Sequence, residues 1–103
     1  MSSIKIRSKR LDGQTQIRTL IAHPMEHGRN VDPKTGELIP PHFIKILTVS
    51  LNDKVIVTGQ MAAGISKDPY FSFLINGGKV GDKITISWVD NRGKTDKEDH
   101  FIK

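Results

Sequence analysis

The chain has 103 residues, of which 16 are Lys or Arg, 11 are Asp or Glu and none is Cys, so its formal net charge is +5. Its 36% of hydrophobic residues and nine glycines together approach the ~45–50% apolar content of ordinary soluble domains. We therefore expect one globular domain over residues 1–103. The lack of cysteine excludes a disulfide scaffold, a cysteine nucleophile and a thiolate-bound metal cluster. No apolar run approaches the roughly 18 residues of a membrane span, so we predict no membrane association.

Apolar and polar residues alternate along most of the chain, which is typical of strands with one face on a core. The pattern begins where Ile4 and Ile6 alternate with basic residues, and a weak last signal lies at residues 100–102. We therefore predict an all-β antiparallel fold of about seven strands. The other predicted strands lie at residues 16–21, 43–51, 54–59, 70–75 and 84–88.

Turn-forming residues separate these segments. The Asp12–Gly13 pair lies between two alternating segments, which is a strong signal for a two-residue hairpin. Short, evenly spaced strands fit both a β-sandwich and a small β-barrel, so this choice stays open here. Further turns are predicted at residues 52–53, 77–78, 81–82 and 91–93.

Two longer segments interrupt the strand pattern. Residues 24–41 contain four prolines and two glycines; such a segment is either a functional loop or a solvated loop stiffened by proline. Residues 60–69 hold small residues at positions 62–64 between the apolar Met61 and Ile65. This second segment is either an interface loop, since small residues allow close backbone approach, or a hairpin loop packed on its own core.

The run from Phe43 to Leu47 has apolar side chains on both faces of its predicted strand. Strands that are covered on both sides read as continuous apolar runs. A loop of this chain or a second protein would cover the outer face. Because large exposed apolar patches are unusual on monomers, we favour a second protein.

The histidines offer one candidate metal site. His23 and His27 are four residues apart, a spacing that points two rings at one ion when the backbone is helical. Pro24 and Gly28 follow them directly and disfavour a helix here. A third ligand would have to come from a distant histidine, at position 42 or 100. We therefore predict no metal site, with one structural histidine at a strand end and three on the surface.

The sequence offers little for catalysis. Asp90, Asp96, Glu98 and Asp99 lie among lysines near the C-terminus, which favours a solvated tail of mixed charge over paired catalytic carboxylates. No phosphate-binding loop and no nucleophile-elbow motif is present. We expect a binding or scaffold protein with no catalytic residue and no cofactor.

The positive charge raises the alternative of a small basic β-barrel that binds single-stranded nucleic acid. Such proteins stack bases on exposed aromatic rings, but the alternation turns most rings inward and leaves Tyr70 as the main platform. Aromatic residues make up 6% of the chain, which is low for that role. The charge therefore fits solubility and an acidic partner better. The basic residues of the first predicted hairpin are Lys5, Arg7, Lys9, Arg10 and Arg18.

Three segments in register resemble one family. They are His23-Pro24-Met25-Glu26-His27-Gly28, residues 64–73 (Gly-Ile-Ser-Lys-Asp-Pro-Tyr-Phe-Ser-Phe) and Trp88-Val89-Asp90-Asn91-Arg92-Gly93. Residues 3–7 and 38–44 match as well. Together they resemble the SoxZ family, subunits of a sulfur-oxidation (thiosulfate-oxidising) carrier complex. The sequence departs from the family at His27 and at Ala62-Ala63, where a small polar residue and a more glycine-rich loop are usual.

The resemblance implies an immunoglobulin-like antiparallel β-sandwich without catalytic activity. It implies a heterodimer with a SoxY subunit, whose C-terminal Gly-Gly-Cys-Gly-Gly arm carries sulfur intermediates on its cysteine. It further implies transient docking of sulfur-oxidation enzymes in the periplasm. Because the first residues lack the apolar core of a secretory signal, we expect export together with SoxY.

The resemblance and the residue pattern together suggest where a partner binds. Methionine and aromatic residues are enriched in the cores of interfaces, and we look for them in loops or on the two-sided strand. The predicted partner contacts are Met25, Phe43, Met61, Ile65 and Tyr70.

Overall fold

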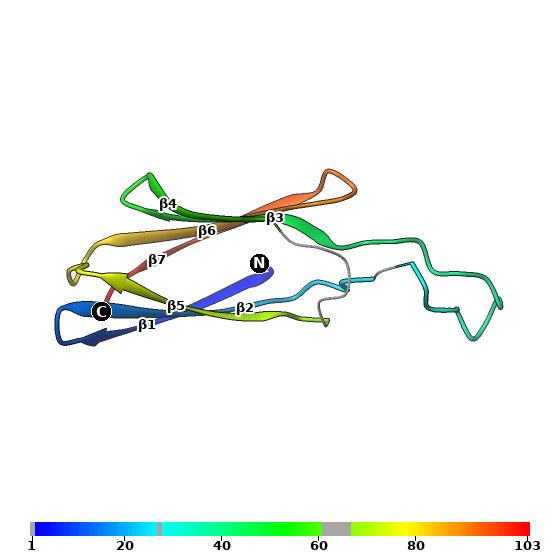
Figure 1. Cartoon of the computed structure of the whole chain (residues 1–103), viewed down its shortest axis with the longest axis horizontal. Helices are drawn as coiled ribbons and strands as arrows, with labels where there is room; N and C mark the ends of the chain where they lie inside the picture. The colour runs from blue at the N-terminus through cyan, green and yellow to red at the C-terminus, as the bar shows by residue number, and fades with distance from the viewer. Residues whose placement is uncertain (1, 27, 61–66) are drawn as a thin grey trace.

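The computed structural model describes residues 2–26, 28–60 and 67–103, and these form two antiparallel sheets (Figure 1). One sheet has the strand order β1-β2-β5 and the other β4-β3-β6-β7. The described residues contain no helix that could cross a membrane. The strands are β1 (Ile4–Leu11), β2 (Gln14–Ile21), β3 (Ile44–Leu51), β4 (Lys54–Gln60), β5 (Tyr70–Asn76), β6 (Lys83–Asp90) and β7 (Thr95–Phe101).

The two sheets face each other as a sandwich, which confirms the predicted all-β class and decides between the two architectures that the strand spacing left open. They do not close into a barrel, so the alternative of a basic nucleic-acid-binding barrel is wrong in its fold. The core lies between the sheets, because every second residue of the central strands points inward. Its fully buried apolar side chains are Ile17, Ile21, Ile44, Val49, Ile84 and Ile86.

Two predicted turns connect neighbouring strands as tight hairpins. Asp12 and Gly13 join β1 to β2, and Gly13 adopts a φ of +70° that costs a glycine little. Asn52 and Asp53 join β3 to β4 with φ values of 50° and 68°. Positive φ at both central residues is the geometry that matches the twist of an antiparallel hairpin.

Residues 22–26 and 28–43, hereafter the arm, lead away from the sandwich and back to it. In Figure 1 the arm extends to the right beyond both sheets, and the long dimension of the molecule is 52 Å against 24 and 21 Å for the others. Isolated bridges pair Glu26 with His42 near its base and Val31 with Leu38 near its tip. The proline-rich segment is therefore a loop that projects from the sandwich and whose two sides are joined by these bridges.

A β-bulge explains the two-sided apolar run at the start of β3. The pairing with β6 shifts register between Ile44 and Ile46, so Ile44 and Leu47 both point inward while Lys45 and Ile46 point outward. Phe43 precedes the strand and is half-buried against the core. The run thus reflects an inserted residue, and only Ile46 remains as an exposed apolar side chain of the strand's first half.

The predicted solvated tail is wrong. Residues 95–101 form β7, which pairs with β6, because alternate polar residues of an edge strand can rest half-buried against β1. Asp96 accepts hydrogen bonds from the backbone N–H and the hydroxyl of Ser3, both at 2.7 Å. Asp90, at the end of β6, is buried. The acidic residues of this segment therefore join the N-terminal segment and the arm to the sandwich.

Candidate functional site

The base of the arm holds a buried cluster of ionisable side chains. His23 follows β2, His42 ends the arm and Asp90 ends β6, so three distant segments supply the cluster. Their ligand-type atoms all lie within 4.8 Å of one another. The edge of the Trp88 ring packs against His23, with ring centroids 5.0 Å apart. This is the only such cluster of three or more histidine and acidic side chains among the described residues.

The hydrogen bonds of the cluster assign its protons. The Met25 backbone N–H donates to Nδ1 of His23 at 3.2 Å, so the proton of this neutral ring is on Nε2. That Nε2–H donates to Oδ2 of Asp90 at 3.2 Å, and Nε2 of His42 lies 2.7 Å from the same oxygen. Oδ1 of Asp90 accepts the backbone N–H groups of Arg92 and Lys94, each at 2.9 Å. Four donors therefore surround one carboxylate.

These contacts decide the charge state of the cluster. Burial alone would raise the pKa of Asp90, but the hydrogen bonds from the two histidines and the two backbone N–H groups lower it to about 2. Burial lowers the pKa of His23 from its ordinary value of 6.5, against the opposing hydrogen bond to Asp90. At neutral pH the cluster thus holds one carboxylate and a neutral His23 ring.

The prediction of one structural histidine and three surface ones is wrong, since His23 is buried and His42 and His100 are half-buried. His27 lies outside the described residues, and the ring beside His23 is that of His42, at 4.6 Å between centroids. The third candidate, His100, instead lies 2.8 Å from the Ser8 hydroxyl across β1 and β7. His23, His42 and Asp90 offer enough ligand atoms for a metal ion, but Nε2 of both rings already faces Asp90 at hydrogen-bond distance. The arrangement fits a structural hydrogen-bond network.

The predicted partner contacts differ in how far their side chains are exposed. Met25 is 4% exposed, and its sulfur accepts the Ile44 backbone N–H at 3.4 Å, so its side chain belongs to the core and offers no surface. Phe43 is half-buried, and its backbone N–H donates to Oδ1 of Asn91 at 2.8 Å. Tyr70 is 59% exposed on the outer face of β5. Met61 and Ile65 lie outside the described residues.

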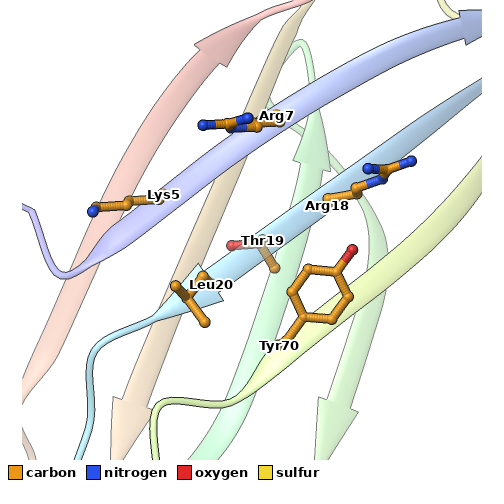
Figure 2. A pocket seen from close by; sticks show the side chains of 6 residues that line it. All are labelled: Lys5, Arg7, Arg18, Thr19, Leu20 and Tyr70. Atoms are coloured by element: carbon orange, nitrogen blue, oxygen red, sulfur yellow. The ribbon is translucent and has the colours of Figure 1, made fainter.

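Tyr70 borders a shallow hollow on the outer face of the three-stranded sheet. The hollow has a volume of about 390 Å³ (Figure 2). Arg10 of the predicted basic hairpin is not part of it, since its guanidinium donates to the carbonyl oxygens of Gly77 and Gly78. Leu20 is a lining residue that the sequence analysis did not single out, although its outward position follows from the alternation along β2. The lining residues are Lys5, Arg7, Arg18, Thr19, Leu20 and Tyr70.

A comparison with protein families matches residues 4–100 to the family described as "Sulphur oxidation protein SoxZ". The match covers nearly the whole chain and confirms the resemblance carried by the three sequence segments. No curated protein matches the chain significantly.

Proposed function

Because the chain belongs to the SoxZ family of sulphur-oxidation proteins, we propose that it is the non-catalytic subunit of a two-protein sulfur carrier. Its partner is a SoxY-like protein that holds sulfur intermediates on the cysteine of a flexible C-terminal segment. The chain itself breaks no bond: it holds the carrier subunit and shapes the surface on which processing enzymes dock in the periplasm.

The arm is the observation that carries this proposal. A pairing subunit needs an ordered surface that its own core does not bury, and the arm projects beyond both sheets. Val31 and Leu38 form a cross-strand pair near its tip and are 56% and 64% exposed. Paired apolar side chains on a projecting element gain free energy when a second protein covers them.

The base of the arm is held in place, which suits it to recognition. Backbone hydrogen bonds link Glu26 and His42 in both directions, at 2.7 and 2.8 Å. The His42 ring then contacts the buried Asp90. The cluster therefore presents the arm in one orientation, so less conformational entropy is lost when a partner binds.

The proposal is tested by co-expressing the chain with the SoxY-like protein of the same organism and measuring the mass of the purified complex. We expect a one-to-one heterodimer. The variants Val31→Asp and Leu38→Asp should raise its dissociation constant on the order of tenfold or more, because a buried charge replaces an apolar contact. Val80→Asp is the matched control, since Val80 is 71% exposed in the connection between β5 and β6. That connection lies at the end of the molecule opposite the arm (Figure 1).

Each outcome has one meaning. A chain that stays monomeric beside the SoxY-like protein contradicts the subunit role. A heterodimer that tolerates both arm substitutions as well as the control keeps the subunit role but removes the arm from the interface. For the periplasmic location, cell fractionation should find the chain outside the cytoplasm only while the partner keeps its export signal.

A further inference from the structure

The outer face of β1, β2 and β5 carries basic side chains on two of its three strands. Lys5, Arg7 and Lys9 alternate outward along β1, and Arg18 points outward from β2. The outward positions of β5 are Tyr70, Ser72, Leu74 and Asn76, and no outward strand residue of this sheet is acidic. We call this surface the basic face.

Two arginines oppose each other at its centre. Arg7 of β1 pairs directly with Arg18 of β2 in the strand register, and Figure 2 shows both side chains above the sheet. Like charges that face each other across neighbouring strands destabilise a sheet. Among the residues that the structure describes, the one hydrogen bond of either guanidinium joins Arg18 to Gln16, a neutral side chain, at 3.0 Å. No carboxylate of this described part of the chain therefore pairs with either arginine.

Apolar side chains lie beside these charges. Leu20, Tyr70 and Leu74 are 42%, 59% and 61% exposed on the same face. In Figure 2 the Tyr70 hydroxyl is directed toward Arg18, and Leu20 borders the ring from β2. Arginine and tyrosine between exposed apolar side chains is the composition found in the centre of protein interfaces.

The opposite face of the sandwich has a different composition. The four-stranded sheet carries Thr48 and Ser87 at paired outward positions of β3 and β6. Its positive Lys97 lies two residues from the negative Asp99 on the same face of β7, and Asp99 accepts a hydrogen bond from the Thr85 hydroxyl at 2.7 Å. This sheet also exposes apolar side chains, among them Val55, Val89 and Phe101. The basic face therefore differs from it in charge and not in exposed apolar area, since its outward strand positions carry basic side chains and no acidic ones.

We propose that the basic face docks an acidic protein partner. Carboxylates of that partner pair with the guanidinium groups of Arg7 and Arg18, and one of its apolar side chains enters the hollow between Leu20 and Tyr70. A carboxylate between the two arginines removes their mutual repulsion and gains charge-assisted hydrogen bonds. This surface is separate from the tip of the arm, so both partners can bind together.

The experiment titrates the whole chain, alone and in its complex with the SoxY-like protein, with a fluorescein-labelled peptide of alternating glutamate and leucine. The peptide offers the charge and the apolar groups that the face selects. We expect binding that weakens at least about tenfold between roughly 50 and 300 mM NaCl, because screening shortens the reach of exposed charges. Amide NMR shifts on the peptide titration should be confined to β1, β2 and β5.

Matched variants separate the charged and apolar contributions. Arg7→Gln with Arg18→Gln should weaken peptide binding at least tenfold, whereas Lys54→Gln with Lys97→Gln removes the same charge from the other sheet and should change it less than twofold. Tyr70→Ala should weaken binding severalfold. Its control is Phe101→Ala, because Phe101 is an aromatic residue of β7 with 58% exposure.

Three outcomes would overturn the proposal. The first is that the arginine pair of substitutions and the lysine pair weaken peptide binding equally, which indicates an effect of net charge alone. The second is displacement of the peptide by inorganic sulfate at an ionic strength where NaCl does not displace it, which indicates a small-anion site. The third is tighter binding of a single-stranded oligonucleotide than of the peptide. None of these outcomes concerns heterodimer formation, which is measured by mass, so either proposal can fail alone.

Discussion

Asp90 shows how much of the architecture one residue can hold. Its carboxylate accepts hydrogen bonds from His23 after β2, from His42 at the base of the arm and from two backbone N–H groups of the turn before β7. The four donors lie in three segments of the chain. A buried acceptor with four donors leaves those donors unsatisfied when it is changed, and an unsatisfied buried group costs more than the bond contributes.

We therefore predict that Asp90→Asn lowers the free energy of unfolding by roughly 2–4 kcal/mol, because the amide N–H₂ must face at least one pair of donors. Urea unfolding followed by circular dichroism measures this change. Asp99→Asn makes the same substitution at an exposed residue whose side chain, within the described part of the chain, accepts one hydrogen bond, from the Thr85 hydroxyl. It should cost less than about 0.5 kcal/mol. Equal costs for the two variants would show that the network contributes no stability.

The same cluster predicts that acid destabilises the fold in two steps. The unfolded chain binds a proton at Asp90 near pH 3.8 and the folded chain only near pH 2, so about 2 kcal/mol is lost as the pH falls through this window. The pKa values of His23 and His100 are lowered by burial, so the unfolded chain also binds more protons just below pH 6.5. Stability should therefore begin to decline below about pH 6.5.

Urea unfolding at several pH values between 7.5 and 2.5 tests this expectation. His23→Gln should reduce the decline between pH 6.5 and 5 and leave the acid step of Asp90 in place, while His100, whose pKa burial also lowers, contributes to the decline that remains. Stability that rises on acidification from pH 7.5 to 5.5 would contradict the assignment of a neutral, buried His23.

No local signal in the sequence reveals this cluster. Its members are separated by 19 and 48 positions, and only the return of the arm to the sandwich brings them together. The sequence offered only the spacing of His23 and His27 as a candidate pair, which was rejected as a metal site, because a local motif is the arrangement that a spacing can show. The buried acid was interpreted as part of a charged tail, since burial of a charge depends on donors from elsewhere in the fold.

At the scale of elements, the sequence predicted the strands correctly wherever apolar and polar residues alternate regularly. The core strands β2 and β6 and the hairpin at Asp12–Gly13 follow directly from that pattern. The bulge in β3 broke the alternation and suggested a two-sided strand, although one inserted residue accounts for it. β7 was underestimated because its half-buried positions are polar and pair with the N-terminal segment, as Asp96 does with Ser3.

The arm depends on a close backbone approach at its base. Gly28 has a φ of +89°, and a Cβ added there would lie 2.7 Å from Cγ of Pro41. Gly36, near the tip, has a φ of +73° with nothing within 4 Å of an added Cβ. A substitution by alanine would therefore strain the backbone at both positions, but it would cause a steric clash only at Gly28.

We predict that Gly36→Ala costs the roughly 1–2 kcal/mol of a left-handed alanine, and that Gly28→Ala costs more because Pro41 must also move. Hydrogen exchange of the Glu26 and His42 amides, which bond to each other's carbonyls, reports on the base of the arm. Their exchange should accelerate more in Gly28→Ala than in Gly36→Ala. The same acceleration in both variants would mean that the contact with Pro41 does not secure the arm.

At the scale of the whole molecule, binding surfaces and structural network occupy different places. The arm projects from one end, the basic face covers one side of the sandwich, and the buried cluster lies where the arm leaves the sheets. Because the two proposed binding surfaces do not overlap, a substitution in one need not affect the other. A substitution at the arm tip should therefore change only the binding free energy of the SoxY-like protein, and a substitution at Arg7 only that of the acidic peptide. A variant with both changes should show each effect at its full size.

The opposed arginines carry a further consequence, for the folding of the chain on its own. Natural sequences minimise local conflicts, and a like-charge pair at matched positions of neighbouring strands is such a conflict. We predict that Arg7→Gln makes the isolated chain more stable by roughly 0.2–1 kcal/mol at low salt, and that the gain disappears near 1 M NaCl. Lys97→Gln, opposite the neutral Ser87, should give no such gain.

A stabilising Arg7→Gln that also loses the acidic peptide would show that the sheet retains a frustrated pair because recognition needs it. Directed evolution for thermal stability alone should then remove this arginine pair early. Selection for partner binding should restore it.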